Sequence, residues 1–162
     1  MKSKWEVSSI TDIVDFNPSY TIKKGTIVTY VEMAAVPEYC REIAYLGERE
    51  FKGGSKFKNG DTLFARITPC LQNGKTSRVS GLDKKQVANG STEFIVMSAK
   101  DYDNDRDFVY YVSLDKEFRK YAEGRMEGTT GRQRVSWQAL SEYELPIPPK
   151  DKRKKIAHIL ST

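Results

Sequence analysis

The clearest pattern in the chain is a series of short segments rich in β-branched and aromatic residues. Thr26–Met33, TIVTYVEM, has the composition of a strand, and Ser91–Met97, STEFIVM, is the most apolar of these segments. A nearly continuous apolar run indicates a strand covered on both faces, so we expect Ser91–Met97 at the centre of the sheet. Further strands are predicted over residues 62–68, 75–79 and 143–147, and the prolines of the last mark it as an edge.

Helical spacing of apolar residues occurs in other parts of the chain. Ser9 is expected to cap a short helix in which Ile10, Ile13 and Val14 share a face. Asp115 is expected to cap the second of two consecutive amphipathic helices. Longer helices are predicted over residues 107–114, 115–126 and 151–160.

The segment between the first two strands lacks a clear period. Residues 34–58 contain Gly47, Gly53 and Gly54 and are predicted to be an irregular connection, long enough to suggest a functional loop. Together the elements predict an α+β fold, a twisted and mostly antiparallel sheet with a few helices to one side.

Composition places the chain among globular proteins. Its 162 residues, 38% hydrophobic and 30% charged, suffice for one domain with a core. Neither a secretory signal nor a run of about 20 apolar residues is present, so the cytoplasm is the expected compartment and no membrane is expected. Cys40 and Cys70 are expected to be buried or half-buried free thiols, with a disulfide as the other option. No metal site is expected, because the only histidine, His158, lies far from both cysteines.

The positive charge is concentrated in two blocks. Residues 41–80 carry eight basic and four acidic side chains, and residues 121–162 carry eight and five, whereas the other two stretches are near neutral. If the two blocks converge in space, they form a basic face suited to a polyanion. The alternative is a slightly basic surface that faces water.

Catalytic and nucleotide-binding patterns are missing from the sequence. It contains no GxxxxGK[ST] motif and no GxGxxG motif after a strand. A Ser/His/Asp arrangement would depend on His158, which we expect on the surface of the terminal helix. The acidic residues between 101 and 107 lack the glycine and glutamate of an EF-hand, which favours solvated, helix-capping acids.

Two groups of residues have the composition of a nucleic-acid reader. The first runs from Arg66 to Lys75 and the second from Gly128 to Arg134, GTTGRQR, and each lies in one of the basic blocks. Duplex readers use lysine, arginine, threonine and backbone amides for phosphates, and arginine, glutamine or asparagine for base edges. The GTTG sequence also matches the minimal GxxG loop of KH domains. The alternative for both groups is a turn whose polar residues face water.

Four segments in order give the chain a family resemblance. They are FKNGDTLFARITPCLQNGKTSRV (57–79), NGSTEFIVM (89–97), MEGTTGRQRVSWQAL (126–140) and ELPIPPKDKRKKIAHIL (144–160). Together with the opening WEVSSITDIV they resemble a target recognition domain of the DNA specificity (S) subunit of type I restriction-modification systems.

The resemblance implies a division of labour among subunits. Family S subunits carry two recognition domains in tandem, joined by long helices that pack as an antiparallel coiled coil, and each domain reads half of a bipartite DNA site. Methyltransferase (M) subunits modify adenine and restriction (R) subunits cut, so no catalytic site or cofactor is expected here. Residues 1–149 would be the recognition domain, and residues 150–162 the start of the coiled-coil helix. The chain would then be a half-subunit, one domain of a larger protein, or a fragment.

Residue roles follow as hypotheses. Lys75, Arg132 and Arg134 are expected to contact DNA. Base-edge candidates are Gln72, Asn73 and Gln133, and phosphate anchors are Thr129 and Thr130 with the amides of Gly128 and Gly131; Arg66 completes the set. Glu93 is expected to bond within the fold, and residues 53–56 are expected to add variable contacts. The apolar Ile156, Ile159 and Leu160 would meet a partner, namely an M subunit, a second recognition domain or another copy of the chain. The competing function is an assembly module that docks an M subunit through this helix.

Overall fold

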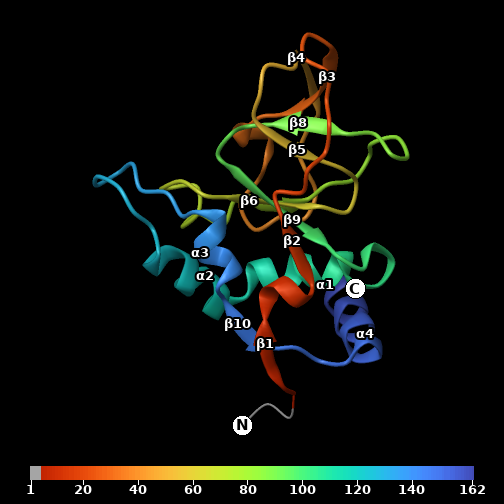
Figure 1. The fold of residues 1–162 in the computed structure, drawn as a ribbon, viewed down its shortest axis with the longest axis vertical. Helices are drawn as coiled ribbons and strands as arrows, with labels where there is room; N and C mark the ends of the chain where they lie inside the picture. The colour runs from red at the N-terminus through yellow and green to blue at the C-terminus, as the bar shows by residue number, and fades with distance from the viewer. Residues whose placement is uncertain (1–4) are drawn as a thin grey trace.

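The computed structural model describes residues 5–162 (Figure 1). Lys2 and Lys4, in the N-terminal segment that is expected not to be a secretory signal, lie outside the described residues. The strands are β1 (Val7–Ser9), β2 (Val14–Phe16), β3 (Ile27–Val31), β4 (Gly47–Glu50), β5 (Ser55–Phe57), β6 (Thr62–Ala65), β7 (Thr76–Arg78), β8 (Ala88–Gly90), β9 (Phe94–Ala99) and β10 (Glu144–Pro146). The α-helices are α1 (Tyr102–Leu114), α2 (Lys116–Gly124), α3 (Trp137–Ser141) and α4 (Lys150–Ser161), and short 3-10 helices cover Ile10–Asp12 and Met33–Ala35.

The central sheet has the order β2-β9-β6-β7, and every neighbouring pair is antiparallel. Side chains alternate along its strands, so β6 and β9 supply buried residues to both faces. Phe64, Ile95 and Met97 join a core cluster with the helices, whereas Leu63 and Val96 join a second cluster on the other face. The expectation that the FIVM segment lies centrally and is covered on both sides is confirmed.

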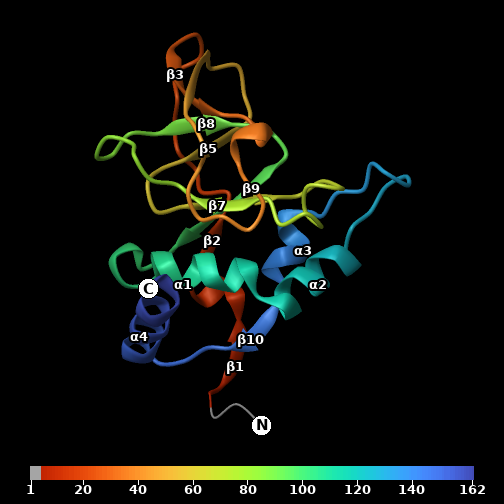
Figure 2. The same cartoon turned by 180° about the vertical axis from the view of Figure 1, so that it is seen from behind.

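The second four-stranded sheet has the order β4-β3-β8-β5 and covers the face of the central sheet opposite the helices (Figures 1 and 2). Its pair β3–β8 is parallel, and the other pairs are antiparallel. Phe57, Val31 and Ala88 fill the space between the two sheets. The molecule is therefore layered as helices, central sheet and second sheet.

The segments near the two ends of the described chain lie together beyond the helices. β1 pairs with β10 in a two-stranded sheet, and α4 packs against α1 (Figure 1). Arg153 of α4 binds Asp105 of α1 through two hydrogen bonds of 2.8 and 3.0 Å. This pair fixes the terminal helix to the body of the domain.

The α+β class, with helices gathered on one side, is confirmed. The prediction of a single sheet is wrong, because the strands form three separate sheets. The prediction that residues 34–58 form an irregular connection is also wrong, since this segment contains β4 and β5. The expected helix after Ser9 is only a 3-10 turn: Ser9 caps it, but the β-branched Val14 already pairs in β2.

Several smaller predictions have clear outcomes. Asp115 caps α2 as predicted, accepting hydrogen bonds from the amides of Glu117 and Phe118. Cys40 and Cys70 are free thiols, but Cys40 is exposed and not buried. Of the acids between 101 and 107, Asp101 caps α1, whereas Asp105 is buried against Arg153 and not solvated. In residues 5–162, no helix has the length and apolar character needed to cross a membrane.

Candidate nucleic-acid interface

The two groups of residues singled out in the sequence meet in the structure. The loop that follows β6 runs beside the segment between α2 and α3 (Figures 1 and 2). The Thr68 amide donates to the Gln133 carbonyl at 2.9 Å, and the Val135 amide donates to the Arg66 carbonyl at 3.0 Å. The two groups therefore converge at this junction, but the two basic blocks do so only in part, because five of the eight basic side chains of residues 121–162 lie on α4, which packs against α1.

The second group forms a projecting loop, light blue in Figure 1. Glu127 and Arg134 close its foot by exchanging two backbone hydrogen bonds of 2.9 Å, and the Arg132 amide donates to the Thr129 carbonyl at 2.9 Å. Gly128 has φ of 121° and would bring an added Cβ within 3.1 Å of the Arg132 carbonyl, so glycine suits this position. Thr129, Thr130 and Arg132 are exposed on this loop.

Arg134 is exposed but paired. Its Nε donates to both carboxylate oxygens of Glu93, at 2.9 and 3.1 Å. The hydrogen bonds that Arg134 donates to Glu93, together with the charge of that carboxylate, raise the pKa of Arg134. Glu93 thus bonds within the protein, as expected, but it does so at the edge of the candidate interface.

The first group is only partly turned toward solvent. The Gln72 amide donates to Thr68 Oγ1 at 2.9 Å and to Met126 Sδ at 3.4 Å. Lys75 Nζ donates to the Met33 carbonyl at 3.2 Å, whereas Asn73 is exposed. Gln72 and Lys75 therefore brace the loop in this structure, and Asn73 is the member best placed to reach a ligand.

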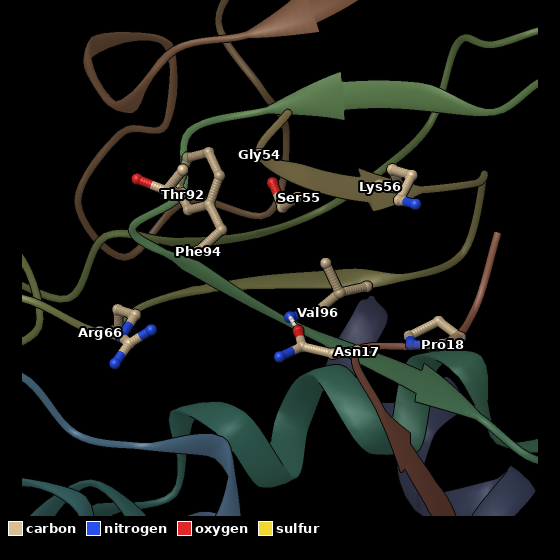
Figure 3. A pocket seen from close by; sticks show the side chains of 9 residues that line it. All are labelled: Asn17, Pro18, Gly54, Ser55, Lys56, Arg66, Thr92, Phe94 and Val96. Carbon is tan, nitrogen blue, oxygen red and sulfur yellow. Dashed lines mark hydrogen bonds between the residues drawn. The ribbon is translucent and has the colours of Figure 1, made fainter. Parts of the chain in front are cut away.

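Arg66 lines a hollow between the central sheet and the second sheet, with a volume of about 350 Å³. Figure 3 shows Arg66 and Asn17 along one side of the hollow, and Ser55 and Lys56 along the other. The Arg66 Nε is buried and makes no hydrogen bond. Buried donors without a partner are rare and cost free energy, which marks this arginine as a candidate functional side chain.

A second hollow, of about 340 Å³, adjoins the first and shares Gly54 and Thr92 with it. The Arg49 guanidinium lies 4.7 Å from the centre of the Tyr30 ring at its wall. At Gly54, φ is 104° and an added Cβ would lie 2.4 Å from the Gly90 carbonyl oxygen. A side chain at this position would collide with the backbone of β8, so glycine is required for the close approach of the two segments.

Sequence reasoning named part of this surface. Residues 53–56, which are expected to add variable contacts, line the two hollows, but the sequence did not single out a set brought in by other strands, namely Asn17, Tyr30, Arg49, Lys52 and Thr92. No local pattern marks them, because they become neighbours only through the pairing of β3 with β4 and of β2 with β9.

The three apolar residues expected to meet a partner differ in their surroundings. Ile156 is half-buried against the core, while Leu160 and Ile159 are 54% and 68% exposed. Ile156 and Leu160 line one apolar groove with Trp5, Phe108 and Leu145. The structure therefore leaves Ile159 and Leu160 as the more accessible pair.

The candidate interface has the chemistry of an anion-binding surface. Guanidinium, ammonium, amide and hydroxyl donors line the hollows and the loop beside them. Among residues 5–162, no group of three or more histidine, cysteine, aspartate or glutamate side chains could hold a metal ion. Such a surface suits phosphates and base edges.

Comparison with known proteins gives a consistent result. The family model of the type I restriction modification DNA specificity domain matches residues 2–162. The specificity subunit of the type I restriction enzyme EcoAI from Escherichia coli is 28% identical over 161 residues, 94% of this chain and 26% of that subunit. The EcoEI specificity subunit of the same organism is 26% identical, over 97% of this chain and 27% of that subunit.

Solved structures show the same fold. The HsdS subunit from Thermoanaerobacter tengcongensis superposes with a TM-score of 0.73 at 18% identity, over 99% of this chain and 42% of that chain. A chain from a structure describing complex assembly and conformational transition of the type I R-M system gives a TM-score of 0.75 at 16% identity, over 97% and 41%. This chain spans about a quarter of the length of the curated relatives it matches. The chain belongs to the family of type I restriction-modification DNA specificity domains.

Proposed function

We propose that this domain binds duplex DNA sequence-specifically and reads one half of a bipartite site, as the non-catalytic specificity component of a type I restriction-modification system. The observation that carries the proposal is the meeting of the 66–75 and 127–134 loops beside the donor-lined hollows, in a chain of the specificity-domain family. As a component of a type I restriction-modification system, the domain would act in the cytoplasm.

Exposure and existing bonds suggest how the contacts divide. Thr129, Thr130 and Arg132 project freely and would hold phosphates together with the loop amides. Asn73 and Gln133 are base-edge candidates, because an amide can form paired hydrogen bonds with adenine. Arg66 would reach the DNA from within its hollow, and Arg134 from beside Glu93. Gln72 and Lys75 could take part only by leaving their present partners.

The partners are part of the same proposal. M and R subunits would supply methylation and cleavage. Residues 1–149 would form the recognition unit, and residues 150–162 would begin the coiled-coil helix. Ile156, Ile159 and Leu160 would then contact an M subunit, a second recognition domain or another copy of the chain. The pure assembly module is the weaker candidate, since α4 already rests on α1 and the donor-lined surface lies elsewhere.

The proposal is tested with Arg132→Ala. Mapping the methylated DNA sites of a cell that carries the intact system identifies the recognised sequence, and the cognate duplex is made from that sequence. We expect the variant to bind DNA about 1–3 kcal/mol more weakly, measured by fluorescence anisotropy on cognate and scrambled duplexes. A loss on the cognate duplex alone assigns Arg132 to a base, and an equal loss on both assigns it to a phosphate.

Lys155→Ala is the matched control, because it removes the same charge from the exposed face of α4. It should leave both affinities almost unchanged. An unchanged affinity after Arg132→Ala would refute the role of this residue. If the wild-type chain shows no saturable, salt-sensitive binding, with or without an M subunit, the proposed function itself is wrong.

A further inference from the structure

A third and larger hollow, of about 630 Å³, lies away from the loops that carry the proposed recognition. Lys58, Lys84 and Lys85 line it together with Tyr20, Asn59 and Tyr102. None of these residues belongs to the two groups that the sequence marked as DNA readers, so the hollow needs its own explanation.

This hollow continues the one in Figure 3. Three separate segments each pass from the first hollow into the third: Asn17 is followed by Tyr20, Lys56 by Lys58, and Val96 by Ser98. In a strand such as β9, residues two apart point to the same face. The Tyr20 hydroxyl lies 3.4 Å from Ser98 Oγ, which joins two of these segments. The two hollows share no lining residue but follow each other along these three segments, and together they are called the groove, which begins at Arg66.

The far end of this groove carries an excess of positive charge. Asp61 is its only acidic lining residue. It is 2% exposed, and its Oδ2 accepts hydrogen bonds from the Lys58 amide at 2.9 Å and the Tyr20 hydroxyl at 3.1 Å. Asp83, in the same turn as Lys84 and Lys85, is exposed. The three ammonium groups thus outnumber nearby carboxylates, and the lining carboxylate is engaged inside the protein.

The turn that presents the two lysines is firmly held. Asn59 binds the backbone of Leu82 in both directions, at 2.8 and 3.0 Å. The Gln86 amide donates to Thr29 Oγ1 at 2.9 Å. Lys85 has φ of 66°, a left-handed conformation that asparagine or glycine adopts at lower cost. The turn therefore holds the Lys84 and Lys85 positions in a defined place beside the hollow.

From this geometry we propose that the far end of the groove binds backbone phosphates of the DNA that flanks the recognised half-site. This inference rests on the proposed function, and it extends the stretch of DNA that the domain would contact. Lysine ammonium groups are compact point charges that pair readily with phosphates, and the Asn59 amide is already used by Leu82. The contacts here position the duplex, while the bases are read at the other end of the groove.

The test is the double variant Lys84→Gln/Lys85→Asn, in which asparagine tolerates the left-handed backbone. Affinity is measured against salt concentration on a long duplex and on one trimmed close to the half-site. On the long duplex, the slope of log affinity against log salt should fall by roughly 2 units, about 0.9 for each lost phosphate contact. The ratio of cognate to scrambled affinity should stay constant, and on the trimmed duplex the variant should match the wild type.

Lys154→Gln/Lys155→Asn is the control, since it removes an equal charge from α4 and should alter neither slope. An unchanged slope in the groove variant, with normal binding by the wild type, overturns this inference and leaves the proposed function intact. A loss confined to the cognate duplex also overturns it, because the lysines would then take part in base reading. Absence of saturable binding by the wild type defeats both proposals.

Discussion

At the scale of single residues, the pair formed by Glu93 and Arg134 is the most informative. It puts a carboxylate at the edge of a surface proposed to bind DNA, where a negative charge weakens the attraction of phosphates. The pair is mostly on the surface, with the arginine and glutamate side chains 45% and 24% exposed. Such pairs contribute little to stability, so we expect this one to act mainly on DNA binding, by engaging Arg134 and placing a repelling charge beside it.

Glu93→Gln tests this reading. We expect the free energy of unfolding to change by less than about 1 kcal/mol, because exposed ion pairs are weak. DNA affinity should rise several-fold on cognate and scrambled duplexes alike, because one repelling charge is removed and the hold on Arg134 is weakened. Anisotropy titrations on both duplexes measure the effect.

Glu142→Gln, an exposed change at the end of α3, is the control and should have no effect. Weaker cognate binding by Glu93→Gln would contradict the expectation. It would mean that Arg134 contacts DNA only while Glu93 holds it in place.

At the scale of the elements, α4 is held to α1 by a buried ion pair. Arg153 is 14% exposed and Asp105 only 2%, and the Arg153 Nη1 also donates to the Pro148 carbonyl at 2.8 Å. The pair therefore joins α1, α4 and the turn that precedes α4. A carboxylate as enclosed as Asp105 needs a counter-charge and hydrogen-bond donors to offset its desolvation.

Arg153→Leu should destabilise the domain by about 3–5 kcal/mol, because it leaves Asp105 buried without its counter-charge. Urea denaturation followed by circular dichroism measures the change. Lys150→Ala breaks only the exposed contact with Asp101 and should cost less than about 1 kcal/mol. A similarly small loss for Arg153→Leu would show that water reaches Asp105 once the arginine is gone.

The elements also show how far the sequence could predict the fold. The strand at β9 and the helices α1, α2 and α4 have clear periodicity, and the cap at Asp115 has a local chemical cause. By contrast, β8 is three residues, Ala-Asn-Gly, and its strand character comes from pairing with β3 and β5. The same limit applies to the site: the loops carry turn and charge signals, whereas Asn17 and Thr92 acquire their positions only from tertiary packing.

At the scale of the whole molecule, two core clusters share the strands β6 and β9. Leu63 points into one cluster, and Ile95 of the neighbouring strand points into the other. The two clusters cannot come apart without breaking the central sheet. The layers are therefore expected to unfold together.

Leu63→Ala and Ile95→Ala test this coupling. Each removes a fully buried side chain and should lower the free energy of unfolding by about 2–5 kcal/mol. Both variants should show one transition, with coincident midpoints by tryptophan fluorescence and circular dichroism. Val7→Ala, at a side chain that is 58% exposed, should change little. Separate midpoints in either variant would show that the two clusters are independent.

The projecting loop is attached to this framework at a narrow foot. Glu127 and Arg134 close it by their two backbone hydrogen bonds, and the fully buried Val135 follows at once. Positions 128–133 therefore contribute little to the packed core, and loops of this kind tolerate changes in length and composition. Substitutions there need not repack the layers beneath, so variants of this loop are expected to keep the fold and to report on ligand contact rather than on stability.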